Sequence, residues 1–218
     1  MTKSCYACDQ PATTKEHAPP FSFFPEGHRN NLITVPSCTL HNNANAMDVE
    51  YTRNIISTFL GVNDVGQRHF LEKAMRSFDH TPALLHTTFS DIQPVKIQGL
   101  EVGVFTTDVK RVNAVMSACL TALHFRETGE KRGLWEIVLP NMGLTDDTTQ
   151  EEADAWRQSL SVIFQMPFQM RVTGSPDVFQ YAVADIDGGR VYSMRFYKAF
   201  LVFGFRPVEV DAVGTQTE

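Results

Sequence analysis

The chain has 218 residues, 43% of them hydrophobic and 20% charged, which is typical of a folded protein and excludes a disordered, collagen-like or coiled-coil chain. It has no apolar run long enough for a spanning helix, and its first ten residues contain no apolar stretch of the kind that a signal peptide needs. We therefore expect a cytoplasmic protein with no membrane partner. The formal net charge of −6 argues against a protein that holds nucleic acid by overall charge.

Three of the four cysteines lie in the first 40 residues, in two closely spaced pairs of metal-ligand residues. Cys5 and Cys8 form CYAC, and Cys38 and His41 form CTLH, with residues 9–37 between them. Two such pairs are typical of a structural zinc site, because each brings two ligands to one tetrahedral ion. A disulfide between Cys5 and Cys8, or a redox CxxC, is the alternative interpretation.

The segment between the two pairs predicts a hairpin, and the segment after them predicts a helix. Leu32, Ile33 and Val35 suit a short strand that enters the second pair. After His41, apolar residues recur every four positions and indicate a helix to about residue 60, namely Met47, Tyr51, Ile55 and Phe59. We call each ligand pair with the turn that holds it a knuckle. A first knuckle, a hairpin, and a second knuckle at the start of a helix form a treble-clef layout.

This N-terminal part resembles the HNH nuclease family. The resemblance covers about the first 55 residues and is carried by three short motifs: Glu16-His17, Asn31-Leu32 and Cys38-x-x-His41-Asn42. In this sequence Glu16 stands where the family more often has Asp, His41 stands for a fourth cysteine, and Asn42 stands where many members have His. All three remain suitable ligand types for zinc or for a hard divalent ion.

The resemblance implies a ββα-metal core that hydrolyses phosphodiester bonds. By similarity, His17 is the general base, and Asn31 fixes the loop that orients it. Glu16 and Asn42 are then the ligands of a catalytic divalent ion, Mg²⁺ or Mn²⁺. Cys5, Cys8, Cys38 and His41 hold only structural Zn²⁺. Phosphodiester hydrolysis needs the same residue types, because a histidine can deprotonate water near neutral pH and a divalent ion stabilises the leaving oxygen.

Each of these residues also has a simpler interpretation. Glu16 and His17 can form a surface ion pair, and Asn31 can be a turn residue. Asn45 competes with Asn42 as the metal ligand, and Asn43 can cap the helix.

The remaining residues, 61–218, predict a second part of helices followed by an antiparallel sheet. We expect a helix over residues 64–78 with Leu71, Met75 and Phe78 inward, then a loop-rich stretch to about 106. A second amphipathic helix over 107–126 contains Cys119 as a core residue. A strand over 134–139 precedes a helix that opens at a capping box, Thr149 and Glu152. Alternating segments around Asp187-Gly188-Gly189 predict a hairpin and a C-terminal sheet.

The predicted fold class is therefore α+β, with a zinc module over residues 1–60 and an α+β domain over residues 61–218. We expect the second part to be a scaffold, an oligomerisation surface or a substrate-selecting domain. Basic residues of the segment 107–133 predict a nucleic-acid face there: Lys110, Arg111, Arg126, Lys131 and Arg132.

Two functions remain open at this stage. The first is a metal-dependent HNH-type endonuclease acting on nucleic acid, DNA rather than RNA, in bacterial anti-phage defence, alone or with a protein partner or as a homo-oligomer. The second is a non-catalytic zinc module that binds nucleic acid or protein. The net charge of −6 favours the second, because nonspecific DNA binding depends on phosphate neutralisation. The additional Glu16, His17 and Asn42 favour the first, because a structural zinc module needs only its four ligands.

Overall fold

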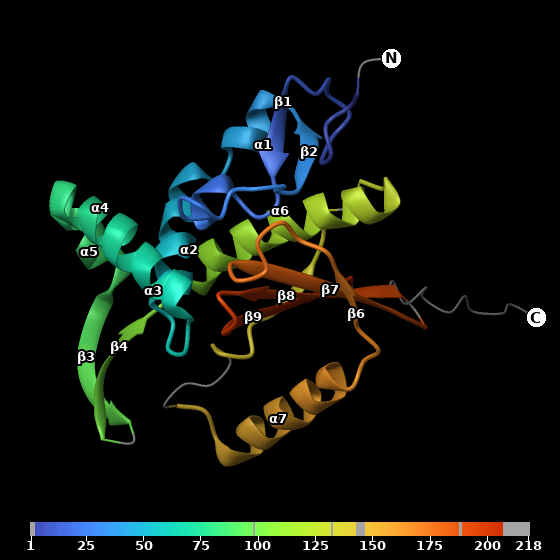
Figure 1. Ribbon diagram of the computed structural model, residues 1–218. Helices are drawn as coiled ribbons and strands as arrows, with labels where there is room; N and C mark the ends of the chain where they lie inside the picture. Colours follow the sequence, from blue (N-terminus) through green and yellow to red (C-terminus); the bar gives the residue numbers. More distant parts are fainter. Residues whose placement is uncertain (1–2, 98, 132, 143–146, 188, 207–218) are drawn as a thin grey trace, which may run out of the picture.

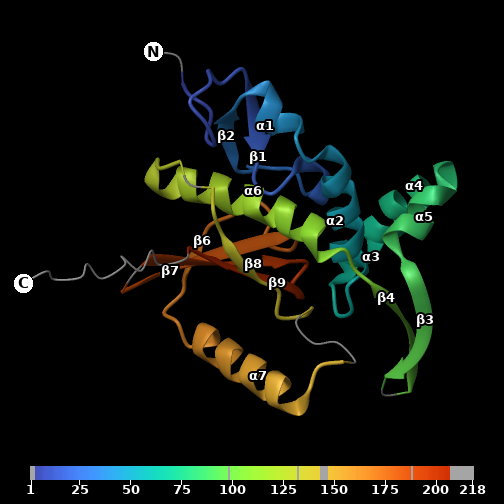
Figure 2. The same cartoon turned by 180° about the vertical axis from the view of Figure 1, so that it is seen from behind.

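The computed structural model describes residues 3–97, 99–131, 133–142, 147–187 and 189–206. Figure 1 shows layers stacked around one long helix, α6 (Val109–Thr128). An N-terminal module lies on one side of α6 and an antiparallel sheet lies on the other, with α7 (Gln150–Phe164) beyond the sheet. Figure 2 shows the same layers from behind. The mixed helix and sheet content confirms the expected α+β class.

The N-terminal module is a two-stranded hairpin followed by two helices. Its elements are β1 (Thr14–His17), the 3-10 turn η1 (Phe21–Phe23), β2 (Thr34–Ser37), α1 (Thr39–Asn43) and α2 (Ala46–Thr58). The strands are antiparallel, and Glu16 lies opposite Val35. Tyr51 and Ile55 are buried as expected, but Met47, in the first turn of α2, is 81% exposed.

The helical segment after α2 has a different inward face from the one predicted. It consists of α3 (Asp64–His69), a π-helical turn η2 (Phe70–Ala74) and α4 (Met75–His80). Phe78 is buried as predicted, whereas Leu71 and Met75 are 63% and 40% exposed. The π turn shifts the helix register, so that Ala74 rather than Leu71 or Met75 faces inward.

The predicted loop-rich stretch to residue 106 is wrong. It contains α5 (Pro82–Thr88) and a hairpin of β3 (Ser90–Ile97) and β4 (Leu100–Thr106). Figure 1 shows this hairpin projecting from the body of the molecule. Phe89, just before β3, has its ring 4.8 Å from that of Phe105 and 5.5 Å from that of Phe78. These aromatic contacts between distant positions leave no periodic signal in the sequence.

The predicted C-terminal antiparallel sheet is confirmed. Its strands in spatial order are β5 (Glu136–Val138), β9 (Phe200–Phe205), β8 (Gly189–Phe196), β7 (Phe179–Ile186) and β6 (Gln169–Arg171). Ile186 pairs with Gly189 at the predicted hairpin turn, of which Gly188 lies outside the described residues.

Helix α7 begins at the predicted capping box. Thr149 and Glu152 form the capping box, with Thr149 N–H donating to Glu152 Oε2 at 2.9 Å. Ala153 is buried, and the Phe164 ring lies 5.5 Å from that of Phe203 in β9. Phe164 is itself 54% exposed, so α7 contacts the sheet through this aromatic pair without burying its whole apolar side.

Helix α6 is buried against the layers on both of its sides. Its inward residues are 0–3% exposed: Val112, Val115, Met116, Cys119, Leu120 and Leu123. Gly204 of β9 permits the close approach of the sheet, because a Cβ there would lie 2.7 Å from Leu120 Cδ2. As expected, Cys119 is a core residue, and burial raises the pKa of its thiol far above the ordinary value. Gly129 ends the helix in the left-handed conformation.

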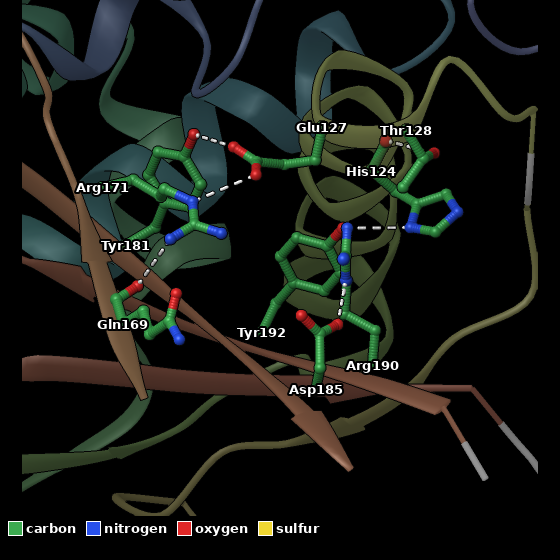
Figure 3. A network of polar contacts seen from close by, with 9 residues as sticks. All are labelled: His124, Glu127, Thr128, Gln169, Arg171, Tyr181, Asp185, Arg190 and Tyr192. Carbon is green, nitrogen blue, oxygen red and sulfur yellow. Dashed lines mark hydrogen bonds and ion pairs between the residues drawn. The ribbon is translucent and has the colours of Figure 1, made fainter. Parts of the chain in front are cut away.

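The C-terminal end of α6 is attached to the sheet by polar side chains (Figure 3). Glu127 accepts hydrogen bonds from Tyr181 Oη at 2.8 Å and from Arg171 Nε at 3.0 Å. One turn earlier, His124 Nδ1 lies 3.0 Å from Tyr192 Oη. Buried hydroxyls and an ion pair thus fix the helix end on β6, β7 and β8, where apolar packing alone would allow it to slide.

One apolar cluster runs from the N-terminal module through α6 into the sheet. It contains Phe23 and Ile55 from the first part and Phe196 from the last. The division at residue 60 stays a prediction, since this core is continuous across it. Among the described residues, no helix is both long and apolar enough to cross a membrane.

Tyr197 joins three distant segments at one buried hydroxyl. It donates to Phe23 O at 2.6 Å, and His69 Nδ1 lies 2.9 Å from the same oxygen. Because the tyrosine proton is used, His69 must donate from Nδ1 as a neutral imidazole. Burial lowers the pKa of His69 to about 4, and three nearby cations contribute to this: Arg53, Arg29 and Lys73.

We expect His69 to make the protein less stable in acid. Its pKa is lower in the folded chain than the 6.5 of an exposed histidine. Its contribution to stability is therefore complete above about pH 6.5 and is lost as the pH falls towards 4, by about 3 kcal/mol. The measurement is urea unfolding of wild type and His69→Asn between pH 7 and 4. Equal pH dependence in the two proteins would contradict this expectation.

A second junction joins the loop after η1 to the segment before β7. His28 Nδ1 lies 3.1 Å from Ser175 Oγ. Gly174 lies against the backbone of Asn30 and Asn31, and a Cβ at Gly174 would overlap Asn30 O and lie 2.7 Å from Asn31 O. The residue must be glycine because the obstacle is backbone, which cannot rotate away.

Gly174→Ala should therefore destabilise the fold by about 1–3 kcal/mol, measured as a loss in the free energy of unfolding in urea. Gly133→Ala is the matched control, since a Cβ at Gly133 meets nothing within 4 Å. Equal stability of the two variants would show that the loop does not pack as described.

Candidate metal centre

The first ligand pair lies at the tip of a tight N-terminal loop. The ends of the loop are held by hydrogen bonds from Cys5 N to Gln10 O and from Ala12 N to Lys3 O, both at 2.9 Å. Tyr6 N donates to Pro36 O at 2.8 Å and attaches the loop to β2. The second pair follows β2 directly, with Cys38 at the N-cap of α1 and His41 inside that helix. The hairpin thus brings the two pairs together.

The four predicted zinc ligands converge on one point. Their ligand atoms all lie within 4.8 Å of one another. Tetrahedral zinc with ordinary bond lengths requires about 3.8 Å between two sulfurs and about 3.6 Å between sulfur and nitrogen. Here Cys8 Sγ lies 3.9 Å from Cys38 Sγ, and His41 Nδ1 lies 3.6, 3.5 and 3.2 Å from the sulfurs of Cys5, Cys8 and Cys38. These residues therefore fit a metal such as zinc.

The cysteines are also chemically prepared for a metal. All four in the chain are free, so the alternative disulfide between Cys5 and Cys8 is not formed. Burial raises the pKa of the Cys5 thiol, but backbone hydrogen bonds from Ala7, Cys38 and Cys8 outweigh burial and lower the pKa to about 6. A thiolate, which is the ligand form, is thus favoured at neutral pH.

Lys131, just beyond α6, supports the first knuckle. Its Nζ donates to Cys8 O at 2.8 Å and forms an ion pair with Asp9 at 2.9 Å. This contact fixes the backbone of a ligand from more than a hundred residues away. The contact was not predictable from the sequence, because nothing in the residues around Lys131 indicates its partner.

Glu16 and Asn42 lie together beside the four-ligand set. Glu16 is in β1, and Asn42 follows His41 in α1. The side-chain amide atom of Asn42 that faces β1 lies 2.9 Å from Glu16 Oε2 and 3.1 Å from Lys15 O. When this atom is assigned as the amide nitrogen Nδ2, Asn42 donates a hydrogen bond to each of these oxygens. Burial raises the pKa of Glu16 to about 7, and the charge of Cys5 contributes further.

His17 ends β1 immediately after Glu16. Its ring lies 5.3 Å from the Phe21 ring, and within the described residues it forms no hydrogen bond to Glu16 or Asn42. Burial lowers the pKa of His17 and favours the neutral imidazole. A neutral histidine can accept a proton from water.

Asn31 lies in the loop before β2 and not at the Glu16–Asn42 contact. Its backbone has a φ of 50°, in the left-handed region that asparagine tolerates. Its carbonyl oxygen faces Gly174, and its side chain is exposed. The structure therefore places Asn31 at the junction with the C-terminal part.

Two residues of the predicted nucleic-acid face of α6 are engaged inside the protein. Arg111 Nε pairs with Asp48 at 2.7 Å, and its guanidinium lies 4.2 Å from the centre of the Tyr51 ring. Lys131 binds the first knuckle, as described above. Lys110 and Arg126 are exposed. Arg132, the fifth predicted residue, lies outside the described residues.

Comparison of the chain with protein-family models, with curated proteins and with solved structures found no match.

Removing one cysteine ligand should release the metal. We expect wild type to contain about one zinc per chain by elemental analysis, and Cys38→Ser to lose it and unfold the N-terminal module. Cys119→Ala, which alters a buried thiol outside the cluster, is the control and should retain zinc. A zinc-free wild type that is equally stable with and without added zinc would contradict the assignment.

Proposed function

We propose that the chain is a metal-dependent HNH-type endonuclease that hydrolyses phosphodiester bonds of nucleic acid, with DNA the favoured substrate. In this proposal residues 1–60 form a treble-clef ββα-metal module stapled by structural zinc. The observation that carries the proposal is the contact between Glu16 on β1 and Asn42 on α1, directly beside the four zinc ligands. A structural zinc site needs only its four ligands, and this pair is additional to them.

The atoms at this contact suit a hard divalent ion. If the Asn42 amide turns its oxygen towards β1, Asn42 Oδ1 lies 2.9 Å from Glu16 Oε2 and 3.1 Å from Lys15 O, and oxygens of these types are the ligands that a hard ion takes. Lys15 lies opposite Pro36, which has no N–H to donate to it. Asn42 is exposed and Glu16 half-buried, so a phosphate can reach them.

The proposed roles follow from the chemistry of each group. Glu16 and Asn42 would hold Mg²⁺ or Mn²⁺, which supplies Lewis-acid stabilisation of the leaving oxygen. His17 accepts the proton of the attacking water, because burial keeps its imidazole neutral at physiological pH. The zinc ligands do not contact substrate and only fix β1 and α1 relative to each other. Asn31 keeps the loop after η1 in place and acts at a distance.

A non-catalytic zinc module is the second candidate, and one observation favours it. With the Asn42 amide nitrogen towards β1, its contacts to Glu16 and Lys15 are ordinary structural hydrogen bonds. Such a module would bind a protein or nucleic acid without cleaving it.

Cleavage assays distinguish the two functions. Purified wild type is incubated with supercoiled plasmid, single-stranded DNA and RNA, with Mg²⁺, with Mn²⁺, and without added metal. We expect metal-dependent cleavage by wild type and a loss of about 100-fold or more in His17→Ala, because the general base is gone. Glu16→Gln and Asn42→Ala should raise the metal concentration needed for half-maximal cleavage, because each removes one ligand of the divalent ion.

His86→Ala is the matched control, since His86 is an exposed histidine on α5. Every variant is checked for zinc content and circular dichroism. Cleavage by His17→Ala at the wild-type rate would refute the mechanism. If wild type and all variants bind nucleic acid but none cleaves it, the non-catalytic zinc module is favoured.

A further inference from the structure

Arg29 and the proposed general base, His17, both contact the ring of Phe21. Its guanidinium carbon lies 4.4 Å from the centre of the Phe21 ring, and Phe21 also contacts His17, at 5.3 Å between ring centres. Phe21 is 44% exposed, so this stack of three side chains is open to solvent. The cation and the candidate base are therefore held by a single side chain.

The contacts of Arg29 leave its terminal nitrogens available. Its Nε donates to Phe24 O at 2.9 Å, which fixes the direction of the side chain. Among the described residues no carboxylate pairs with Arg29, whereas Arg111, Arg171 and Arg190 each have one. Two N–H-bearing nitrogens on a fixed, exposed guanidinium match the geometry of two phosphate oxygens.

The loop that carries Arg29 is positioned by the C-terminal part of the chain. His28 contacts Ser175, and the backbone of Asn30 and Asn31 lies against Gly174. The residues on both sides of Arg29 are thus attached to the segment before β7. A cation held in this way loses little conformational entropy when it binds a ligand.

We propose that Arg29 is a substrate-binding residue that contacts a phosphate of the nucleic acid next to the bond cleaved at His17, with Phe21 as its positioning residue. This inference rests on the proposed function. It gives the C-terminal part of the chain a role in substrate binding, through the loop. It also supplies a local positive charge at the site of a protein whose net charge is −6.

The test measures both cleavage and binding. Cleavage is measured as kcat/KM for wild type, Arg29→Gln and Arg29→Lys with Mg²⁺. Binding of a short fluorescent DNA duplex is measured over a range of salt concentrations, with all proteins carrying His17→Ala so that the probe stays intact. Arg157→Gln is the matched control, because Arg157 is an exposed arginine on α7, on the opposite side of the sheet from β1.

We expect Arg29→Gln to lower kcat/KM about tenfold and to reduce the slope of log affinity against log salt by about 0.9, the value for one lost phosphate contact. Arg29→Lys should keep the salt slope, because it keeps the positive charge. It should lose part of kcat/KM, because an ammonium lacks the paired N–H donors of the guanidinium. Phe21→Leu should lower kcat/KM with a smaller change in slope. Arg157→Gln should match wild type in both assays.

The outcomes separate this inference from the proposed function. If wild type cleaves and Arg29→Gln retains its kcat/KM and salt slope, the inference is wrong and the function stands. If wild type binds DNA without cleaving it, the nuclease proposal is wrong, and a reduced slope in Arg29→Gln still establishes the phosphate contact. If wild type neither binds nor cleaves DNA or RNA, both are wrong.

Discussion

The burial of α6 on both sides is the constraint on which the other layers depend. One side of the helix packs against the sheet and the other against the N-terminal module, so neither layer has a complete core without it. Met116 and Leu120 are wholly buried in this way. Polar contacts at the two ends fix its direction: Arg111 binds Asp48 near the start, and Lys131 binds Asp9 just past the end. The helix therefore sets the distance between the module and the sheet.

The N-terminal module depends on two kinds of restraint, a metal site and packing on α6. A metal held by two ligand pairs would close the loop before β1 onto the helix after β2. Packing on α6 joins the module's own buried side chains, such as Phe23 and Ile55, to the core of the rest of the chain. Glu16 lies on β1 and Asn42 on α1, and both elements are fixed by the metal site and by the packing of the module on α6. A site built on these elements can keep its geometry without contributing to the stability of the fold.

The sequence predicts those features that depend on local pattern. The spacing of the ligand pairs, the periodicity of α6, the capping box of α7 and the alternation of the C-terminal strands are all found in the structure. Features that depend on distant contacts were not predictable. The β3–β4 hairpin has Pro94 within its first strand, which interrupts the alternation, and its attachment depends on Phe89 and Phe105 meeting Phe78. At the site, the resemblance to HNH nucleases indicated Glu16 and Asn42 as partners, but the engagement of Lys131 required the fold.

The single hydroxyl of Tyr197 has a consequence for how this chain can evolve. The hydroxyl contacts Phe23 from the first part of the chain and His69 from the middle. Tyr197 itself lies between β8 and β9 of the C-terminal sheet. Shuffling of protein modules needs a seam that few contacts cross, and here a buried three-way contact crosses the region around residue 60. The carbonyl that Tyr197 binds belongs to the backbone, so a replacement module of any sequence can supply it only if the module docks in the same position. The contact therefore constrains where the N-terminal module sits and not which side chain stands at position 23.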